Sequence, residues 1–339
     1  MMDLNQLWFV LVAVLYAGFF FLEGFDFGVG MLLPLLGRND LERRTILNAI
    51  GPHWDANEVW LITAGGATFA AFPQWYATMF SAFYPVLFLL LLALIARGVA
   101  FEFRGRGSGA AWRGAWDAAI WIGSLLPALI LGALFANLLR GVPIDGHMIY
   151  AGDLLAPVNP YSLVCGLAVV SIFLLHGANF LGLKLEGELG ERARAAGRRL
   201  WPAALFLTFV FLAFTFSSTD IFNRLGYGSI LLPVGTIAGM VLIRYFLGRK
   251  RDGWAFAFGG LTILLLAAIF FTALFPRVMV SSLRPDFNLT IYTAAASDYS
   301  LRVSTIVALI FIPVVVIYQA WSYWIFRKRI KADPERLEY

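Results

Sequence analysis

The sequence predicts an all-α polytopic membrane protein, and three observations lead to this fold class. Of its 339 residues, 60% are hydrophobic and only 14% are charged, whereas a soluble chain of this size needs roughly twice that charged fraction. The apolar residues gather in segments of about 20, the length of a helix that crosses a bilayer. Basic residues recur in every second connection between these segments. A water-soluble enzyme domain is therefore excluded.

Nine apolar segments follow one another along the chain. They cover residues 7–36, 52–72, 75–96, 116–138, 161–183, 201–218, 229–247, 254–275 and 302–326. The longest connections are the external 140–160 and 277–301 and the internal 98–115 and 184–200. None of them is long enough to form a separate domain. Any chemistry must therefore take place in or beside the membrane.

The basic residues predict the orientation of these spans. Most of the 26 Lys and Arg residues lie in loops one, three, five and seven or in the C-terminal tail, and Arg97 is counted with the third loop. Cytoplasmic loops of membrane proteins collect Lys and Arg, so the N-terminus is expected outside, the C-terminus inside, and the number of spans odd. The same tendency accounts for the net charge of +5. Lipid is therefore an expected partner and nucleic acid is not.

A short internal echo suggests how the chain is divided. Residues 22–27, Leu-Glu-Gly-Phe-Asp-Phe, are similar to residues 175–180, Leu-His-Gly-Ala-Asn-Phe. Spans one to four and five to eight also match in direction, which favours duplication of a four-helix unit. We therefore expect a first bundle over 1–140 and a second over 141–277. An external loop, the ninth helix and a cytoplasmic tail then occupy 278–339.

Four carboxylates inside the first two spans are the candidate functional residues. Glu23 and Asp26 share one helix face near mid-membrane, and Asp55 and Glu58 repeat this spacing at the inner end of the second span. A charged residue within the bilayer costs about 2.5–3.5 kcal/mol, so each needs a partner, water or a function. Such a series suits proton transfer inward from the cytoplasm. Two structural alternatives are that Asp26 bonds to a neighbouring helix and that Asp55 caps the second span.

Histidine and cysteine are scarce in this chain. The three histidines are His53, His147 and His176, and Cys165 is the one cysteine. Haem needs axial His or Met ligands, and His176 alone lies deep in a span, with no second histidine to pair with it. We therefore expect neither haem nor a metal ion to be bound by this chain alone.

Five runs of sequence carry a resemblance to a known family. They are residues 23–30 (EGFDFGVG), 37–40 (GRND), 51–67 (GPHWDANEVWLITAGGA), 252–256 (DGWAF) and the aromatic stretch 318–324 (YQAWSYW). Together they resemble subunit II of cytochrome bd-type quinol oxidases. The resemblance covers essentially the whole chain, and the run 51–67 is highly specific.

The resemblance implies nine helices, arranged as two four-helix bundles plus one peripheral helix, beside a similarly folded subunit I in the bacterial plasma membrane. It further implies that subunit I carries two haems b, one haem d and the quinol site. Such a complex oxidises quinol, reduces dioxygen to water with cytoplasmic protons and generates a membrane potential. Some members also have a structural quinone in this subunit, or a small single-helix accessory subunit.

The resemblance also suggests roles for individual residues. The aspartate that matches Asp55 is assigned in the family to a proton path that enters from the cytoplasm near the subunit boundary. The tryptophan that matches Trp60 lies near a proposed dioxygen route, and aromatic packing is its alternative role. Asp26 matches the acidic position of the motif, whereas some relatives have an amide in place of Glu58. The other motif neighbours of interest are His53, Trp54 and Asn57.

These observations predict the non-haem subunit II of a terminal quinol oxidase, in which Asp55, Glu58, Asp26 and Glu23 carry protons toward the oxygen-reducing haem of subunit I. A proton-coupled secondary transporter is the alternative, because an internal repeat and intramembrane carboxylates are compatible with it. The unmatched ninth span fits a transporter poorly. A purely structural scaffold for subunit I differs from the first prediction only in whether the carboxylates titrate.

Overall fold

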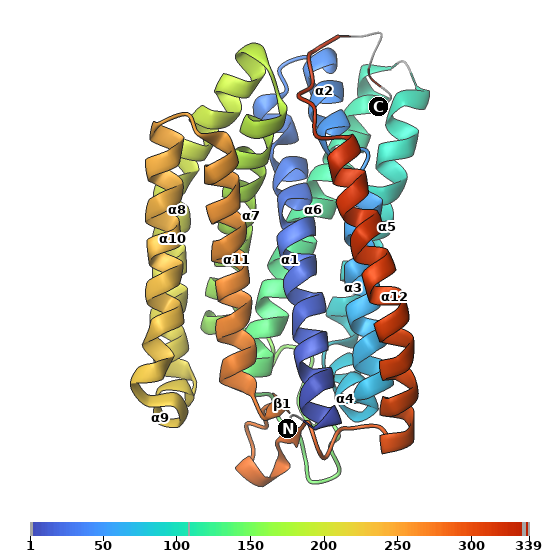
Figure 1. The fold of residues 1–339 in the computed structure, drawn as a ribbon, viewed down its shortest axis with the longest axis vertical. Coiled ribbons are helices and arrows are strands. Elements are labelled where there is room, and N and C mark those ends of the chain that lie inside the picture. Colours follow the sequence, from blue (N-terminus) through green and yellow to red (C-terminus); the bar gives the residue numbers. More distant parts are fainter. Residues whose placement is uncertain (1–2, 108, 334–336, 338–339) are drawn as a thin grey trace.

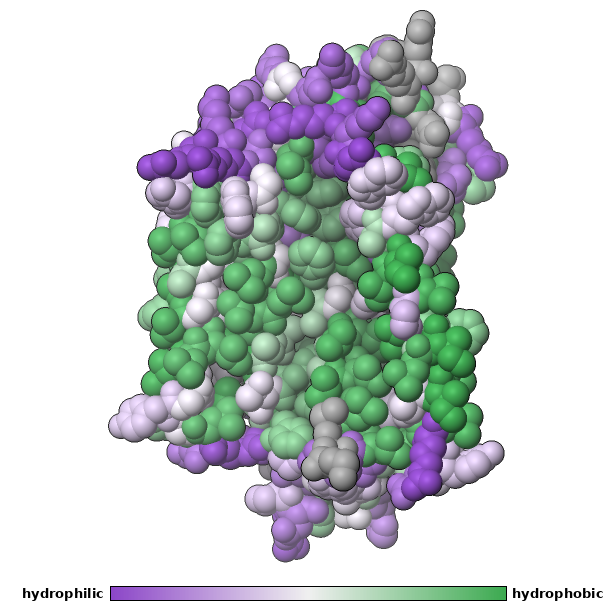
Figure 2. Space-filling model, viewed as in Figure 1, coloured by the Kyte–Doolittle hydropathy of each residue, from purple (hydrophilic) through white to green (hydrophobic). Residues whose placement is uncertain are grey.

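The computed structural model describes residues 3–107, 109–333 and 337 and is dominated by long helices that lie side by side (Figure 1). An apolar band covers the face shown in Figure 2, and hydrophilic residues gather at both ends of the molecule. In chain order the elements are α1 (Leu4–Leu36), α2 (Asp40–Ile50), α3 (Trp54–Ala71), α4 (Pro73–Ala82), α5 (Tyr84–Phe103), α6 (Ala110–Arg140), α7 (Pro160–Lys184), α8 (Gly187–Ser218), α9 (Ile221–Leu225), α10 (Leu231–Gly248), α11 (Asp252–Leu274), β1 (Arg277–Met279), β2 (Leu289–Thr290) and α12 (Asp298–Ile325).

Eight helical segments within the described residues are long and apolar enough to cross a membrane. They are α1, α5, α6, α7, α8, the continuous segment of α9 and α10, α11 and α12. The predicted second span coincides with α3, which is not among the eight. Its first turns are polar because they contain Asp55, Asn57 and Glu58.

The predicted third span, 75–96, has the wrong bounds. A separate short helix, α4, occupies the beginning of that range, and α5 then runs on to Phe103. Proline marks both starts, because Pro73 and Pro85 lie in the first turns of α4 and α5. A proline is favoured there, since an N–H of the first turn has no partner within the helix.

The connections between the apolar segments contain more regular structure than hydropathy alone indicates. The inner connection 184–200 is mostly helical, because α8 begins at Gly187. The first inner loop contains α2, whose N-terminus is capped where Asn39 accepts a 2.9 Å hydrogen bond from the backbone N–H of Glu42. In the external connection before α12, β1 and β2 form a short antiparallel pair.

The two echo segments lie in contact, on the neighbouring helices α1 and α7. Phe25 stacks on Phe180 with ring centroids 4.2 Å apart. A Cβ atom at Gly28 would lie 1.9 Å from the carbonyl oxygen of Phe173 and 2.9 Å from Cα of Gly177. Glycine at position 28 therefore allows the two backbones to approach this closely.

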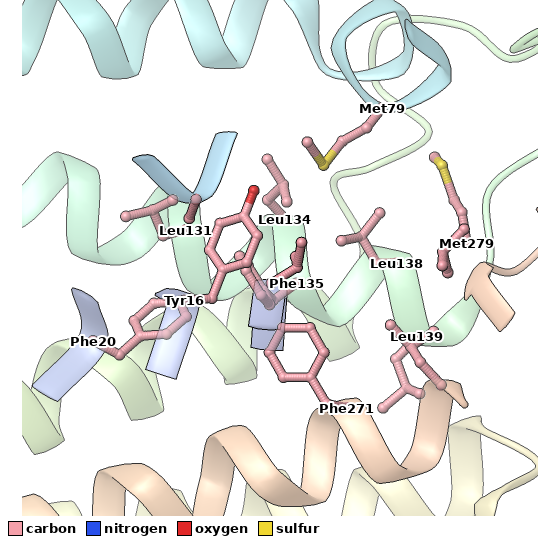
Figure 3. Close-up of a cluster of buried hydrophobic side chains, with 14 of the residues drawn as sticks. Tyr16, Phe20, Met79, Leu131, Leu134, Phe135, Leu138, Leu139, Phe271 and Met279 are labelled. Carbon is pink, nitrogen blue, oxygen red and sulfur yellow. The ribbon is translucent and has the colours of Figure 1, made fainter. Parts of the chain in front are cut away.

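Aromatic rings fill the space between α1, α6 and α11. Phe20 and Tyr16 each meet Phe135 edge to face, with centroids 5.0 and 5.2 Å apart, and Phe271 lies against the same ring (Figure 3). Edge-to-face pairs place the positive ring edge against a negative ring face and add about 0.5–1.5 kcal/mol to the burial of the rings. This packing holds α1 in the centre of the molecule.

An ion pair joins the external turns of the chain. Arg277 on β1 donates two hydrogen bonds, of 2.7 and 2.8 Å, to the carboxylate of Asp220, which precedes α9. Partial burial disfavours the charge on Asp220, but the hydrogen bonds and charge of Arg277 outweigh burial and hold the pKa of Asp220 below its usual value. The stabilisation is therefore present above about pH 4, the pKa of an unfolded aspartate, and is lost as the pH falls through the lower folded value.

Replacing Arg277 by Gln is expected to loosen this external region. The pair contributes about 1 kcal/mol, so hydrogen exchange of residues 277–290 should rise roughly fivefold at pH 7. As the pH falls below about 4 and through the lower folded pKa of Asp220, the two proteins should converge, because the wild-type pair is then lost as well. Hydrogen exchange corrected for intrinsic rates checks this, with the exposed Arg284→Gln as a control. Equal exchange at pH 7 would argue against the pair.

Candidate functional site

A buried arginine lies at the centre of the predicted carboxylate cluster. Arg97 on α5 is fully buried, and its Nη1 lies 2.5 Å from Oε1 of Glu23 and 3.1 Å from Oε2 of Glu58. The rings of Phe27 and Phe101 flank the guanidinium, with centroids 4.8 and 5.3 Å from Cζ. Because arginine stays protonated in proteins, one fixed cation joins a carboxylate of α1 to a carboxylate of α3.

The expected position of Arg97 in an inner loop is therefore wrong. The third span was started too early, so its predicted end at residue 96 fell just before this arginine. Two signals could have located it. Pro85 marks the start of α5, and four intramembrane carboxylates call for a nearby cation.

An amide holds the second acidic residue of α1. Oδ2 of Asp26 accepts a 2.6 Å hydrogen bond from Nδ2 of Asn57, and both residues are fully buried. Oδ1 of Asn57 in turn accepts hydrogen bonds of 2.8 Å from Nε2 of Gln319 and 2.9 Å from the hydroxyl of Tyr323, both on α12. The interhelical hydrogen bond considered for Asp26 is therefore present. The sequence interpretation did not assign Gln319 or Tyr323 to the site.

Asp55 lies at the exposed end of the cluster, in the first turn of α3. It does not cap this helix, because the N-cap is His53, which makes no side-chain capping bond. The His53 ring stacks on Tyr323 with centroids 4.1 Å apart, and Trp54 stacks on Phe101 at 4.8 Å. His53 thus packs the beginning of α3 against α12, and Trp54 packs it against α5.

Trp60 packs against the first helix. A Cβ atom at Gly18 would lie 2.5 Å from Cζ3 of the indole, so the ring rests directly on this glycine of α1. The aromatic packing role is therefore present. A dioxygen route past Trp60 remains a prediction.

Several buried atoms of the cluster have no hydrogen-bond partner among the described residues. They are Oε2 of Glu23, Oδ1 of Asp26, and Nε and Nη2 of Arg97. A buried polar atom without a partner costs about 1–3 kcal/mol, which protons or bound water relieve. One guanidinium balances one of the three carboxylates Glu23, Asp26 and Glu58, so the cluster is neutral only when it binds two protons.

The two buried histidines do not fit as haem ligands. His176 stacks on Phe256 with centroids 4.6 Å apart, and a Cβ at Gly259 would lie 2.8 Å from its Nδ1. His53 is enclosed by Tyr323 and Phe326. Neither histidine lines the apolar cavity beside α7 or the polar pocket at the external turns. Among the described residues, no three His, Cys, Asp or Glu side chains are grouped to hold a metal ion.

Comparison with known proteins gives consistent matches along the whole chain. The family model described as cytochrome bd terminal oxidase subunit II matches residues 4–326. The cytochrome bd ubiquinol oxidase subunit 2 of Bacillus subtilis (strain 168) is 47% identical over 330 residues, which are 97% of this chain and 98% of the relative. The cytochrome bd-I ubiquinol oxidase subunit 2 of Escherichia coli (strain K12) is 36% identical over 371 residues, which cover 98% of this chain and 97% of the relative.

The fold matches a solved structure as well. A chain of the bd oxidase from Geobacillus thermodenitrificans superposes with a TM-score of 0.73 and 19% identity, over 96% of this chain and 99% of that chain. At this identity the match concerns the fold, whereas the family model and the two relatives concern the sequence itself. On the evidence of the family model and the two relatives, the chain belongs to the subunit II family of cytochrome bd terminal oxidases.

Proposed function

We propose that this chain, a multi-pass plasma membrane subunit of a terminal quinol oxidase, supplies a cytoplasmic proton path to the oxygen-reducing site of its complex. One observation carries the proposal. Glu23, Asp26 and Glu58 form a buried cluster around Arg97, and Asp55 stands at its exposed end.

The proposed path begins at Asp55 and continues over carboxyl oxygens. Asp55 and Glu58 are three residues apart on α3 and lie on one side of it. Glu58 is 18% exposed, so it is the member of the cluster that a proton from Asp55 reaches first. The guanidinium of Arg97 does not release its own protons. It serves as a fixed counter-charge while protons move between Glu58 and Glu23 over oxygens and water.

We propose that the outward face of α3 meets subunit I. Asp55 shares this face with the exposed apolar side chains of Val59, Ile62 and Phe69. A carboxylate turned toward lipid is unfavourable, whereas a partner protein can supply a polar continuation of the path. The path would then leave this chain at the subunit boundary.

The haems and the quinol site are proposed to lie in subunit I. The absence of a suitable setting around His53 and His176 supports this assignment for the two haems b and the haem d. The names of the relatives give ubiquinol as a substrate, and we propose a quinol as the electron donor here, with dioxygen as the acceptor.

We further propose nine membrane crossings, with α3 as the crossing added to the eight apolar segments. The first helix begins at the end of the molecule opposite to the end at which α12 stops (Figure 1), as an odd number of crossings requires. An external N-terminus and a cytoplasmic C-terminus agree with the basic inner loops. We also propose the division into bundles at 1–140 and 141–277, with 278–339 as the remainder, so that the contact between the two echo segments joins the two bundles.

Replacing Asp55 by Asn tests the proton path. The amide cannot carry a proton, so quinol oxidase turnover of the assembled complex should fall about tenfold or more with its haems intact. Glu58→Gln should also lower turnover, because an amide interrupts the carboxyl oxygens between Asp55 and Glu23, although its oxygen can still accept the hydrogen bond from Arg97. Turnover and haem spectra of the purified complexes measure both outcomes.

The exposed inner carboxylate Glu188, 75% exposed at its side chain, is the matched control as Glu188→Gln. Unchanged turnover in Asp55→Asn would remove Asp55 from the path and favour the purely structural scaffold. No described feature favours the transporter alternative over the activity of the family.

A further inference from the structure

The peripheral helix α12 touches the rest of the chain sparsely, and Leu301 is its one buried residue. Near its beginning, Nε1 of Trp8 donates to the carbonyl oxygen of Leu301 at 3.2 Å and to Oγ1 of Thr305 at 3.0 Å. Near its other end, Gln319 and Tyr323 bond to Asn57. A helix that buries so little apolar surface thus directs two polar side chains to a single buried amide.

The hydrogen bonds of Asn57 have a definite direction. Its carbonyl oxygen receives two donors from α12, and its NH₂ group therefore faces α1 and donates to Oδ2 of Asp26. Reversing the amide would bring its NH₂ against the NH₂ of Gln319 and its oxygen against Asp26. An ionised carboxylate only accepts hydrogen bonds, so the reversed amide would leave Asp26 without its donor whenever that carboxylate is ionised.

This direction limits where Asp26 can carry a proton. Oδ2 is occupied as an acceptor by Asn57, so a proton on Asp26 belongs on Oδ1, which has no other partner among the described residues. Glu23 has the same arrangement, since Arg97 occupies its Oε1 and its Oε2 is free. Glu23 and Asp26 lie three residues apart on one face of α1, so a proton on one of these free oxygens can be shared with the other side chain directly or through water.

We propose that α12 is a positioning element of the carboxylate cluster, in which Gln319 and Tyr323 orient Asn57 so that Asp26 takes its proton on Oδ1 and shares it with Glu23. The positioning of Asp26 does not depend on the proposed proton path. Only the expected effect on turnover rests on that path. Gln319 and Tyr323 act through Asn57 and do not themselves carry the proton.

The charged and titratable groups around Asp26 come from four helices. They are Glu23 on α1, Glu58 on α3, Arg97 on α5 and Tyr323 on α12. Arg97 and the Asn57 amide favour the charged form of Asp26, whereas Glu23 and Glu58 disfavour it when they are ionised. When Asn57 is no longer held in this orientation, its hydrogen bond to Asp26 weakens. Arg97 and the carboxylates of Glu23 and Glu58 stay in place.

The test uses the complete oxidase with the double variant Gln319→Met/Tyr323→Phe, which removes both donors to Asn57 while keeping side chains of similar size. The readout is the infrared carbonyl band of protonated Asp26, identified by its loss in Asp26→Asn. In the double variant the pH at which this band disappears should move upward by about one unit, the equivalent of a lost hydrogen bond to a charged group. Each single variant keeps one donor and should shift less.

The matched control is Tyr318→Phe, on the same helix at a residue that is 61% exposed. An unchanged band and midpoint in the double variant, with the complex intact, would overturn the inference, as would an equal shift in the control. If the band shifts while the pH profile of turnover stays the same, α12 does position Asp26, and it is the proton path that fails. A shift in both, with the KM for quinol unchanged, supports the two together.

Discussion

Replacing Arg97 by Gln is expected to lower the free energy of unfolding of the assembled oxidase by about 3–5 kcal/mol, the cost of leaving a buried charge without its partner. Glu23 and Arg97 are both fully buried, so bulk water does not replace the lost cation. Glu58 loses the same partner. Thermal unfolding of the purified complex, followed by retention of haem absorbance, measures the loss.

A second substitution separates the lost ion pair from lost packing. The double variant Arg97→Gln/Glu23→Gln removes the carboxylate of Glu23 together with its cation, and the two new amides can hydrogen-bond to each other. Much of the lost stability should therefore return. The exposed Arg249, which contacts the Tyr245 ring, provides the control Arg249→Gln with little expected effect. If Arg97→Gln and the double variant were equally unstable, packing of the long side chain would be the dominant contribution.

Replacing Gly28 by Ala is expected to destabilise the protein by about 3 kcal/mol, the upper part of the usual range for overpacking. The added methyl group would lie 1.9 Å from a backbone carbonyl oxygen of Phe173. A backbone atom cannot move aside as a flexible side chain can, so α1 and α7 would have to separate along their contact. Yield and thermal stability of the complex in detergent give the measurement.

Gly114 on α6 is the matched control, because a Cβ atom there meets nothing within 4 Å. Gly114→Ala should be neutral, or stabilising by up to about 1 kcal/mol, since alanine favours helix more than glycine does. Equal stability of the two alanine variants would show that α1 and α7 can repack around an added methyl group. That result would contradict the close approach at Gly28.

The positions of most spans follow from local sequence because a bilayer requires long apolar runs. The predicted 161–183 and 254–275 agree with α7 and α11 within a few residues. The prediction for 75–96 was wrong because hydropathy averages across Phe83 and Pro85, where two helices meet. Helix starts depend on caps and prolines, which a run of apolar residues does not reveal.

The candidate site was predictable in part. The pairs Glu23 with Asp26 and Asp55 with Glu58 could be placed on common helix faces from their spacing alone. The spacing could not show that Arg97 joins Glu23 to Glu58, nor that Asn57 faces Asp26. These contacts join α1 to helices tens of residues further along the chain.

By itself, the sequence determined that this chain is a membrane protein, which family it belongs to, and which carboxylates lie within its helices. Hydropathy, motifs and helical spacing suffice for this because all three are local properties of the sequence. Only the tertiary structure decided that a buried arginine pairs with two of those carboxylates, Glu23 and Glu58, and that side chains of α12 bond to Asn57. The rotation of each helix about its axis, and hence the partner that each side chain meets, depends on the packing of the whole bundle. That packing is a sum over contacts between segments far apart in the chain.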